Sequence, residues 1–282
     1  MMVRIEVILI LLSLYSSFII VANSKRVVVL GANGQTGRRC VELALKRGYE
    51  TIAVTRSGDL ADLPSYSLSK SLKTCKGDVK DLSNANWEAV DAVIYCASAS
   101  KEGGTALEVD FEGVVNGGRL CIQQGVGRYV VVSSGATSKP FSPVYLFLNL
   151  FGGIMANKAK GEQAVREMYA SAPANVGYTI VRPGGLTTEP AVGVGGIELN
   201  QQDEKSGRIS RWDVAELCLE CVDSADTSRT TIDCYNKDTG RPLSQVGLSN
   251  LFKLKQDAPV AAGKYERRGT SWKEIFQGLT KD

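Results

Sequence analysis

Residues 26–37 have the sequence Arg26-Val27-Val28-Val29-Leu30-Gly31-Ala32-Asn33-Gly34-Gln35-Thr36-Gly37. The apolar run up to Leu30 leads straight into a turn with three glycines, and a helical pattern follows from Thr36 to Arg47. A continuously apolar strand is typical of a parallel sheet that is buried on both faces. Glycines at this spacing let the backbone turn tightly and approach a phosphate at the helix N-terminus. The stretch therefore predicts a nucleotide-binding β-α-β unit; an ordinary tight turn is the alternative.

Strand and helix patterns continue to alternate along the chain. The predicted strands are residues 51–55, 72–75, 92–96, 129–132, 178–181 and 230–234, and the predicted helices are residues 106–124, 145–169, 211–222 and 271–279. This order predicts an α/β fold of the Rossmann type, a doubly wound parallel sheet with helices on both faces. Ligands of such sheets bind at the carboxyl ends of the strands. We expect one NAD(P)-binding domain over residues 25–282, with residues 251–282 as a C-terminal extension.

Residues 1–24 differ from the rest of the chain. One positive charge, Arg4, precedes an almost wholly apolar run from Val7 to Ala22, which ends in the small-x-small pattern Ala22-Asn23-Ser24. This pattern predicts a signal peptide cut after Ala22 or Ser24, or else an uncleaved signal anchor. We expect entry into the secretory pathway, leading either to a plastid bounded by additional membranes or to the ER lumen or membrane. Any membrane contact is expected through this leader alone.

Composition excludes several classes of function. The chain has 282 residues, a formal net charge of +3 with basic and acidic residues interspersed, and no histidine. The charge does not favour nucleic acid as a partner. The missing histidine excludes Ser-His-Asp hydrolysis, Cys-His proteolysis and histidine-ligated metal sites. Cys218 and Cys221 form a C-x-x-C motif without a second pair, so we predict that the chain binds no metal ion. We expect the seven cysteines to be buried free thiols.

The residue after the second strand of a dinucleotide-binding unit selects the cofactor. A carboxylate there holds the ribose 2′-hydroxyl of NAD, whereas an arginine accommodates the 2′-phosphate of NADP. This chain has Arg56 at that place, and its guanidinium offers charge-assisted hydrogen bonds to the phosphate, with Arg38 or Ser57 as helpers. A solvated surface arginine is the alternative. The sequence therefore predicts that NADP(H) is preferred over NAD(H).

These motifs occur in a fixed order with several others. The set is Gly31-Ala32-Asn33-Gly34-Gln35-Thr36-Gly37-Arg38, Arg56, Gly77-Asp78-Val79, Cys96-Ala97-Ser98-Ala99, Val131-Val132-Ser133-Ser134, Lys158 and Val181-Arg182-Pro183-Gly184-Gly185. Over roughly residues 25–215 the chain resembles the atypical short-chain dehydrogenases/reductases of the NmrA-like, NAD(P)-binding group. That group includes flavin and biliverdin reductases and a plastid translocon-associated NADP-binding protein.

The resemblance implies a place at the cofactor for each motif. Asp78 and Val79 would border the adenine, residues 97–99 would line the nucleotide ribose, and Pro183 and Gly184 would pass the nicotinamide. A turn cap at Asp78 and a strand end at Pro183 are the alternatives. The predicted cofactor-binding residues are Gly31, Asn33, Gly34, Gln35, Thr36, Gly37, Arg38, Arg56, Asp78, Val79, Ala97, Ser98, Ser133, Lys158, Pro183 and Gly184.

The catalytic motif of the superfamily is incomplete. Its Tyr-x-x-x-Lys pair uses the lysine to lower the tyrosine pKa for proton exchange with the substrate. Lys158 is present, but Ile154 occupies the tyrosine position, and Gly135 stands where related reductases often have a catalytic hydroxyl. Lys158 is left as the candidate catalytic residue or as a ligand of the nicotinamide ribose. Tyr145 and Tyr178 are candidate proton donors by residue type only.

Two functions fit this incomplete site. The first is an NADPH-dependent reductase of a conjugated acceptor, such as a flavin, quinone or tetrapyrrole, which needs little acid catalysis from the protein. The second is a non-catalytic NADP(H) sensor or an assembly factor with a protein partner. An epimerase or dehydratase ranks third, because it would need the missing tyrosine or a pair of carboxylates.

Overall fold

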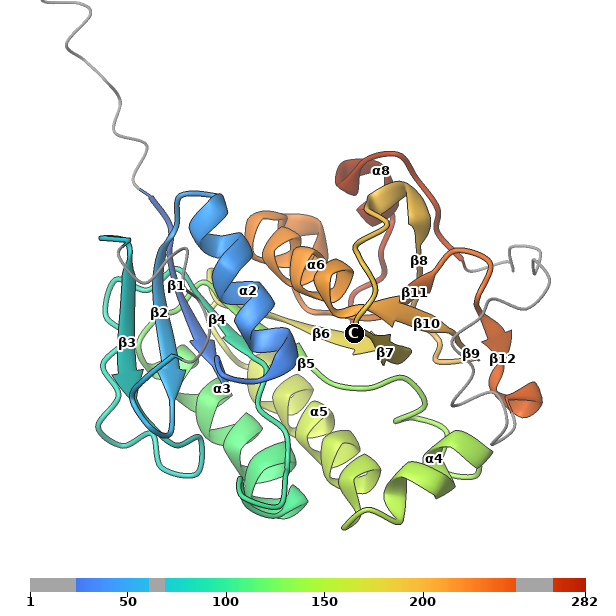
Figure 1. The fold of residues 1–282 in the computed structure, drawn as a ribbon, viewed down its shortest axis with the longest axis horizontal. Coiled ribbons are helices and arrows are strands. Elements are labelled where there is room, and N and C mark those ends of the chain that lie inside the picture. Colours follow the sequence, from blue (N-terminus) through green and yellow to red (C-terminus); the bar gives the residue numbers. More distant parts are fainter. Residues whose placement is uncertain (1–23, 61–68, 247–265) are drawn as a thin grey trace, which may run out of the picture.

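An eight-stranded sheet forms the centre of the computed structural model, which describes residues 24–60, 69–246 and 266–282 (Figure 1). The strand order is β3-β2-β1-β4-β5-β6-β11-β8. The strands are β1 (Arg26–Leu30), β2 (Glu50–Thr55), β3 (Leu72–Lys76), β4 (Ala92–Tyr95), β5 (Arg128–Val132), β6 (Gly177–Pro183), β8 (Ile197–Asn200) and β11 (Thr230–Asn236). All of them pair in parallel except β8, which runs antiparallel to β11. The predicted doubly wound sheet is confirmed.

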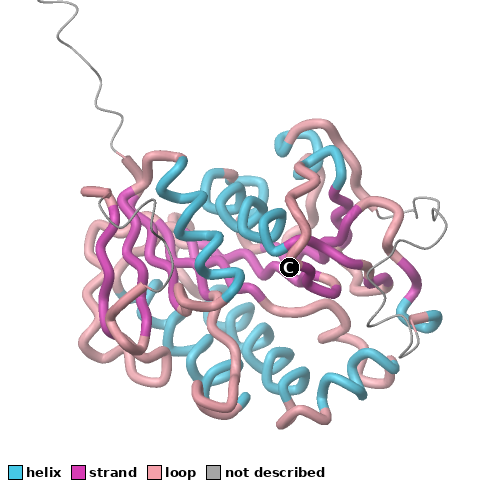
Figure 2. Tube along the Cα trace, viewed as in Figure 1, coloured by secondary structure: helices cyan, strands magenta, loops and turns pink. Residues whose placement is uncertain are grey.

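Helices cover both faces of this sheet (Figure 2). On one face, α2 (Gln35–Lys46) and α6 (Arg211–Asp223) pack together over a core that includes Cys40, Val41 and Leu217. On the other face lie a π-helical turn η1 (Leu107–Gly113), α3 (Val114–Gln123) and α5 (Ile154–Ala170). The buried residues there include Tyr95, Tyr129 and Val165. The sheet is therefore buried on both sides, as its apolar strands require.

The structure divides the long helix predicted over residues 145–169. A short helix α4 (Pro143–Asn149) ends before Gly152 and Gly153, and α5 begins at Ile154. Both glycines have left-handed backbone angles, with φ of +66° and +72°, which end a helix at little cost for glycine. The prediction of a continuous helix was wrong because apolar residues flank the two glycines on both sides and suggest one periodic run.

Short elements complete the fold beyond β6. The sequence patterns did not predict several strands in this part of the chain. These are β7 (Gly185–Thr187), β8 (residues 197–200), β9 (Lys205–Ser206), β10 (Arg208–Ser210) and β12 (Arg241–Pro242). Single helical turns lie at η2 (Val194–Gly196), η3 (Ala225–Thr227) and η4 (Leu243–Gln245), and α8 (Trp272–Phe276) falls within the predicted last helix. Residues 1–23 of the predicted leader and residues 251–264 lie outside the described residues. Within the described ranges, no helix has the length and apolar character to cross a membrane.

Buried charges join β6 to α5 and β11. Arg182 Nη2 lies 2.5 Å from Glu162 Oε2, and Arg182 Nη1 lies 3.8 Å from the carboxylates of Asp203 and Asp233. All four side chains are almost fully buried. Burial alone would raise the pKa of Glu162, but the Arg182 guanidinium outweighs it and holds that pKa below its ordinary value. Removing Arg182 or Glu162 would leave the charge of the other buried without its close partner.

The two aspartates of this cluster differ in their hydrogen bonds. Asp203 accepts from the backbone N–H groups of Ala136 and Ser138, at 2.5 and 2.8 Å, and so fixes the loop that leaves β5. Asp233 Oδ2 accepts from the Asp203 N–H at 2.6 Å, whereas its Oδ1 has no hydrogen-bond partner among the described residues. Burial, together with the Asp203 carboxylate, raises the pKa of Asp233 to about 8. Asp233 is therefore mainly protonated at neutral pH.

Replacing Asp233 by asparagine, which imitates the protonated acid, should change how stability depends on pH. The folded-state pKa of about 8 lies above the unfolded value of 3.8. The stability contributed by protonated Asp233 is thus fully present below about pH 4 and is lost as the pH rises to about 8. In urea unfolding we expect Asp233→Asn to match the wild type near pH 4.5 and to be at least about 2 kcal/mol more stable at pH 8. A constant difference across this range would contradict the assignment.

Candidate functional site

The glycine turn places the start of α2 at the carboxyl ends of β1 and β4. Gly31 has φ of +78°, and a Cβ there would lie 2.7 Å from the Ala97 backbone nitrogen. A Cβ on Gly37 would lie 2.3 Å from the Gly31 carbonyl oxygen, so only glycine lets the helix start this close to the turn. Gly34 precedes α2, no side chain caps the helix, and its first turn has no acidic residue. An uncapped N-terminus with these properties fits an anionic group such as a pyrophosphate.

Other residues of the turn hold its shape. The Asn33 side-chain amide donates to the Asp59 carbonyl at 2.9 Å, and Arg38 Nη2 donates to the Asn33 carbonyl at 3.3 Å. Gln35 is exposed and Thr36 is buried, both in the first turn of α2. The predicted pyrophosphate residues therefore lie together, and Asn33 also ties the turn to the segment that follows β2.

Arg56 follows the last residue of β2, as the sequence predicts. Its guanidinium is exposed and donates to the carbonyl of Glu102, in the segment after β4. Next to it, the Ser57 hydroxyl donates to the Asp59 carbonyl at 3.2 Å. The positive charge at the end of β2 thus lies at the carboxyl edge, and its contact with a 2′-phosphate remains a prediction.

The predicted adenine residues lie beside β2. The Gly77 N–H donates to the Thr55 carbonyl at 2.9 Å, which brings the segment after β3 next to the end of β2. Asp78 forms a local turn, because its carboxylate accepts from the Lys80 N–H at 3.1 Å. Val79 is buried in the core under η1. A binding surface for the adenine at these residues remains a prediction.

Lys158 is paired with a buried carboxylate that sequence reasoning missed. Lys158 Nζ lies 2.7 Å from Asp110 Oδ1, and the Asp110 side chain is completely buried. The same carboxylate accepts from the Ser98 hydroxyl and from the Ala99 N–H, both at 2.9 Å. Asp110 therefore joins Lys158 of α5 to the predicted ribose-binding segment after β4. The sequence feature that could have indicated this role was Asp110 itself, an acidic residue beside Val109 in an otherwise apolar helix face.

The predicted residues after β5 and β6 serve the buried charge cluster and the packing of the sheet. The Ser133 hydroxyl donates to Glu162 Oε1 at 2.6 Å. Pro183 is buried, and its carbonyl accepts from the Gly135 N–H at 2.8 Å. A Cβ on Gly184 would lie 2.4 Å from the Gly207 carbonyl oxygen. These three residues lie at the carboxyl edge with the others, and their contact with a nicotinamide remains a prediction.

The two candidate tyrosines occupy different places. Tyr178 lies near the amino end of β6, and its hydroxyl donates to the Asp282 carboxylate at 2.9 Å. Burial and this carboxylate raise the pKa of Tyr178 well above its ordinary value. Tyr145 is buried on α4, next to the loop that leaves β5. Tyr178 is therefore excluded as a proton donor for the candidate site, and Ile154 is the first residue of α5.

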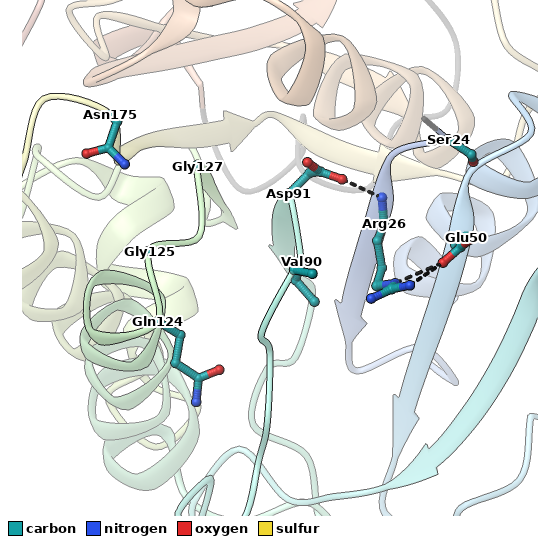
Figure 3. Close-up of a pocket in the computed structure, with 10 residues that line it drawn as sticks. Ser24, Arg26, Glu50, Val90, Asp91, Gln124, Gly125, Gly127 and Asn175 are labelled. Atoms are coloured by element: carbon teal, nitrogen blue, oxygen red, sulfur yellow. Dashed lines mark hydrogen bonds and ion pairs between the residues drawn. The ribbon is translucent and has the colours of Figure 1, made fainter. Parts of the chain in front are cut away.

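A pocket of about 450 Å³ opens at the opposite edge of the sheet, where the strands begin (Figure 3). Asp91 accepts from the Arg26 N–H at 2.7 Å, and the Arg26 guanidinium pairs with Glu50 at 2.8 Å. These contacts connect neighbouring strands. Because ligands of doubly wound sheets bind at the carboxyl edge, we assign no cofactor to this pocket.

All seven cysteines are free thiols, and among the described residues no group of three or more cysteine or acidic side chains could hold a metal ion.

Comparison with known proteins agrees with this geometry. The model of a family described as NAD(P)H-binding matches residues 31–225. A chloroplastic protein of Arabidopsis thaliana is 33% identical over 222 residues, covering 74% of this chain and 76% of that protein. A Bacillus subtilis protein named an uncharacterized sugar epimerase is 27% identical over 221 residues, covering 76% and 95%. A Bacillus halodurans structure, named as an NAD-dependent epimerase/dehydratase, is 25% identical with a TM-score of 0.61, covering 79% and 98%.

The pairing of Lys158 with Asp110 predicts strong energetic coupling between them. In a double-mutant cycle of Asp110→Asn and Lys158→Met, followed by urea unfolding, we expect a coupling energy of about 1 to 3 kcal/mol because the pair is buried. The control cycle is Arg26→Met with Glu50→Gln. That pair has 40% and 50% of its side chains exposed and should give less than about 1 kcal/mol. Equal coupling in both cycles would show that Lys158 is not held by Asp110.

Proposed function

The chain belongs to the NAD(P)H-binding family, and from that premise we propose that it is an NADPH-dependent reductase of a conjugated acceptor such as a flavin, a quinone or a tetrapyrrole. Proteins similar to this chain include ones named as epimerases, and structures of similar fold include one named as an NADH-flavin reductase. The observation that carries the proposal is the combination at the start of α5. Ile154 occupies the tyrosine position, while Lys158 is kept and is held by a buried carboxylate.

The proposed cofactor site uses the carboxyl edge of the sheet. The N–H groups of α2 would hold the pyrophosphate, Arg56 the 2′-phosphate, and Lys158 the hydroxyls of the nicotinamide ribose. When bound, the cofactor would supply a hydride. Asp110 would orient Lys158 by its 2.7 Å ion pair, and one or two N–H donors of the ammonium group would remain for the ribose.

The missing phenol determines the class of acceptor. Hydride addition to a simple ketone leaves an alkoxide, which needs a proton from a positioned acid; such an acid commonly contributes about 10² to 10⁴-fold. A flavin or quinone delocalises the added charge and can take its proton from water. The absence of a tyrosine at position 154 therefore supports a conjugated acceptor, and it also counts against epimerase chemistry despite the name of the Bacillus subtilis relative.

A non-catalytic NADP(H) sensor or assembly factor is the second candidate function, favoured by the same isoleucine at position 154.

We also propose that the protein works in a plastid reached through the predicted leader. The chloroplastic Arabidopsis thaliana relative supports a plastid, and the ER remains the alternative. Imaging a fluorescent fusion of the full chain distinguishes these two locations.

Arg56→Ala should selectively weaken NADPH. Losing a hydrogen bond to a charged group costs about 1.5 to 3 kcal/mol, so we expect roughly tenfold to 150-fold weaker NADPH binding and nearly unchanged NADH binding in calorimetric titrations. Arg119→Ala, which removes one exposed positive charge from α3, is the matched control and should leave both affinities unchanged. Equal losses for both cofactors in Arg56→Ala would refute the role of Arg56.

NADPH oxidation with FMN, a quinone and a simple ketone tests the reaction class. We expect turnover with FMN or the quinone, at least about 100-fold slower turnover with the ketone, and no large effect of Tyr145→Phe. Tyr178→Phe is the control, since Tyr178 lies at the other end of its strand. Efficient ketone reduction that Tyr145→Phe abolishes would reveal a relocated tyrosine. Tight NADPH binding without turnover of any acceptor would instead favour the sensor or assembly role.

A further inference from the structure

Two residues with left-handed backbone angles contact each other where the chain leaves β5. Ala136 has φ of +71° and Asp203 has φ of +50°. A side chain makes this conformation unfavourable, so such residues persist only where their surroundings hold them, and they cluster in binding loops and switch regions. Here the holding contact is direct, because the Asp203 carboxylate accepts from the Ala136 N–H at 2.5 Å. A carboxylate from a distant part of the chain therefore maintains the strained backbone at Ala136.

The same carboxylate holds the rest of the turn between β5 and α4 (Figure 1). We call residues 134–138 the β5 loop. The Ser138 N–H and hydroxyl both donate to Asp203 Oδ2 at 2.8 Å, and Ala136 and Asp203 are completely buried. The β5 loop directly follows Ser133, a predicted cofactor-binding residue at the carboxyl edge. Asp203 thus sets the shape of a loop that borders the candidate site.

A second buried aspartate lies against this contact. Asp233 is 1% exposed and its Oδ2 accepts from the Asp203 N–H at 2.6 Å, whereas its Oδ1 has no hydrogen-bond partner among the described residues. Arg182 Nη1 lies 3.8 Å from both carboxylates, which is beyond hydrogen-bond distance. An ionised Asp233 would therefore repel the Asp203 carboxylate with little compensation, and a proton on Asp233 removes the repulsion.

The charges around Asp233 balance only when one acid is protonated. The charged groups that face it are Arg182 from β6, Asp203 from the segment after β8, and Glu162 from α5, with Arg166 of α5 behind Glu162. Arg182 Nη2 lies 2.5 Å from the Glu162 carboxylate and Arg166 lies 3.1 Å from it, so both cations are committed mainly to Glu162. The Asp203 carboxylate accepts three hydrogen bonds from the β5 loop, which favour its charged form. Asp233 is therefore the acid that carries the proton.

We propose that Asp203 and Asp233 form a proton-controlled latch on the β5 loop. A proton on Asp233 keeps the Asp203 carboxylate in place, and loss of that proton drives the two carboxylates apart and releases the strained loop. This control of the candidate site is independent of the proposed reaction.

The direction of the pH dependence follows from the two states of the latch. Burial and the Asp203 carboxylate raise the pKa of Asp233 to about 8 in the latched state. In the released state the Asp203 carboxylate has moved away, so the pKa of Asp233 is lower. Release therefore becomes easier as the pH rises towards about 8, where the latched state still holds the proton and the released state has lost it, and the effect levels off above that pH.

Hydrogen–deuterium exchange of the Ala136 and Ser138 amides reports the latch directly. The full chain is followed from pH 6 to pH 9 by mass spectrometry at single-residue resolution, and each rate is divided by the intrinsic rate at the same pH. We expect protection of these two amides to fall at least about tenfold between pH 6 and pH 8.5, which is the effect of one pKa unit between the two states. Their protection should stay below that of the Val28 amide in β1, which is buried in the centre of the sheet.

Variants separate the latch from a general effect of pH. In Asp233→Asn, which cannot ionise, we expect the protection of both amides to match the wild type at pH 6 and to stay constant up to pH 9. The control Asp226→Asn removes the charge of an exposed aspartate in η3 and should keep the wild-type pH dependence. Constant protection in the wild type, or an unchanged pH dependence in Asp233→Asn, would overturn the proposal. Protection equal to that of Val28 at every pH would also overturn it, because the loop would then open only when the whole domain unfolds.

Discussion

The contact between Gly37 and the Gly31 carbonyl is the constraint on which the candidate site depends. A side chain at either glycine would collide with backbone, at 2.3 Å for Gly37 and 2.7 Å for Gly31. Without side chains there, α2 starts directly over the ends of β1 and β4. These two strands are neighbours at the point where the strand order reverses, which is where doubly wound sheets bind their ligands. The N-terminus of α2 therefore lies at the place where the fold predicts a ligand.

The Lys158–Asp110 pair limits the chemistry that the candidate site could supply. Because a buried carboxylate lies 2.7 Å from the ammonium group, the pair adds no net charge near the predicted nicotinamide end. In the proposed function, with Ile154 at the tyrosine position, this neutral pair would offer little stabilisation to a developing alkoxide. It can still position a cofactor, because the ammonium group is anchored and retains N–H donors. This arrangement supports the proposal that the acceptor itself carries the added charge.

Sequence patterns predicted the parts of the fold that follow from local rules. The strand β1 is apolar because both faces of the sheet are buried, and the glycines after it are needed because a side chain would collide there. Both requirements can be recognised from the residue types alone. The antiparallel strand β8 was not predicted, because its pairing with β11 is a contact between residues that are far apart in the sequence. The role of Asp110 and the partners of Ser133 were not predicted for the same reason. The partner of a carboxylate depends on which helices come into contact in the folded chain. Spacing located Lys158, but only tertiary structure shows what holds it.

One face of α5 connects the candidate site to the buried charge cluster. Lys158 and Glu162 are four residues apart, so they lie on the same face of the helix, one turn from each other. Lys158 reaches Asp110 in η1, while Glu162 reaches Arg182 in β6 and accepts from Ser133 after the end of β5. A shift of α5 would strain both ion pairs at once, because it would leave the buried carboxylates of Asp110 and Glu162 without their cations. The cluster therefore does more than join strands: it fixes the rotation of α5, and through that rotation it sets where the ammonium group of Lys158 stands against the carboxyl edge.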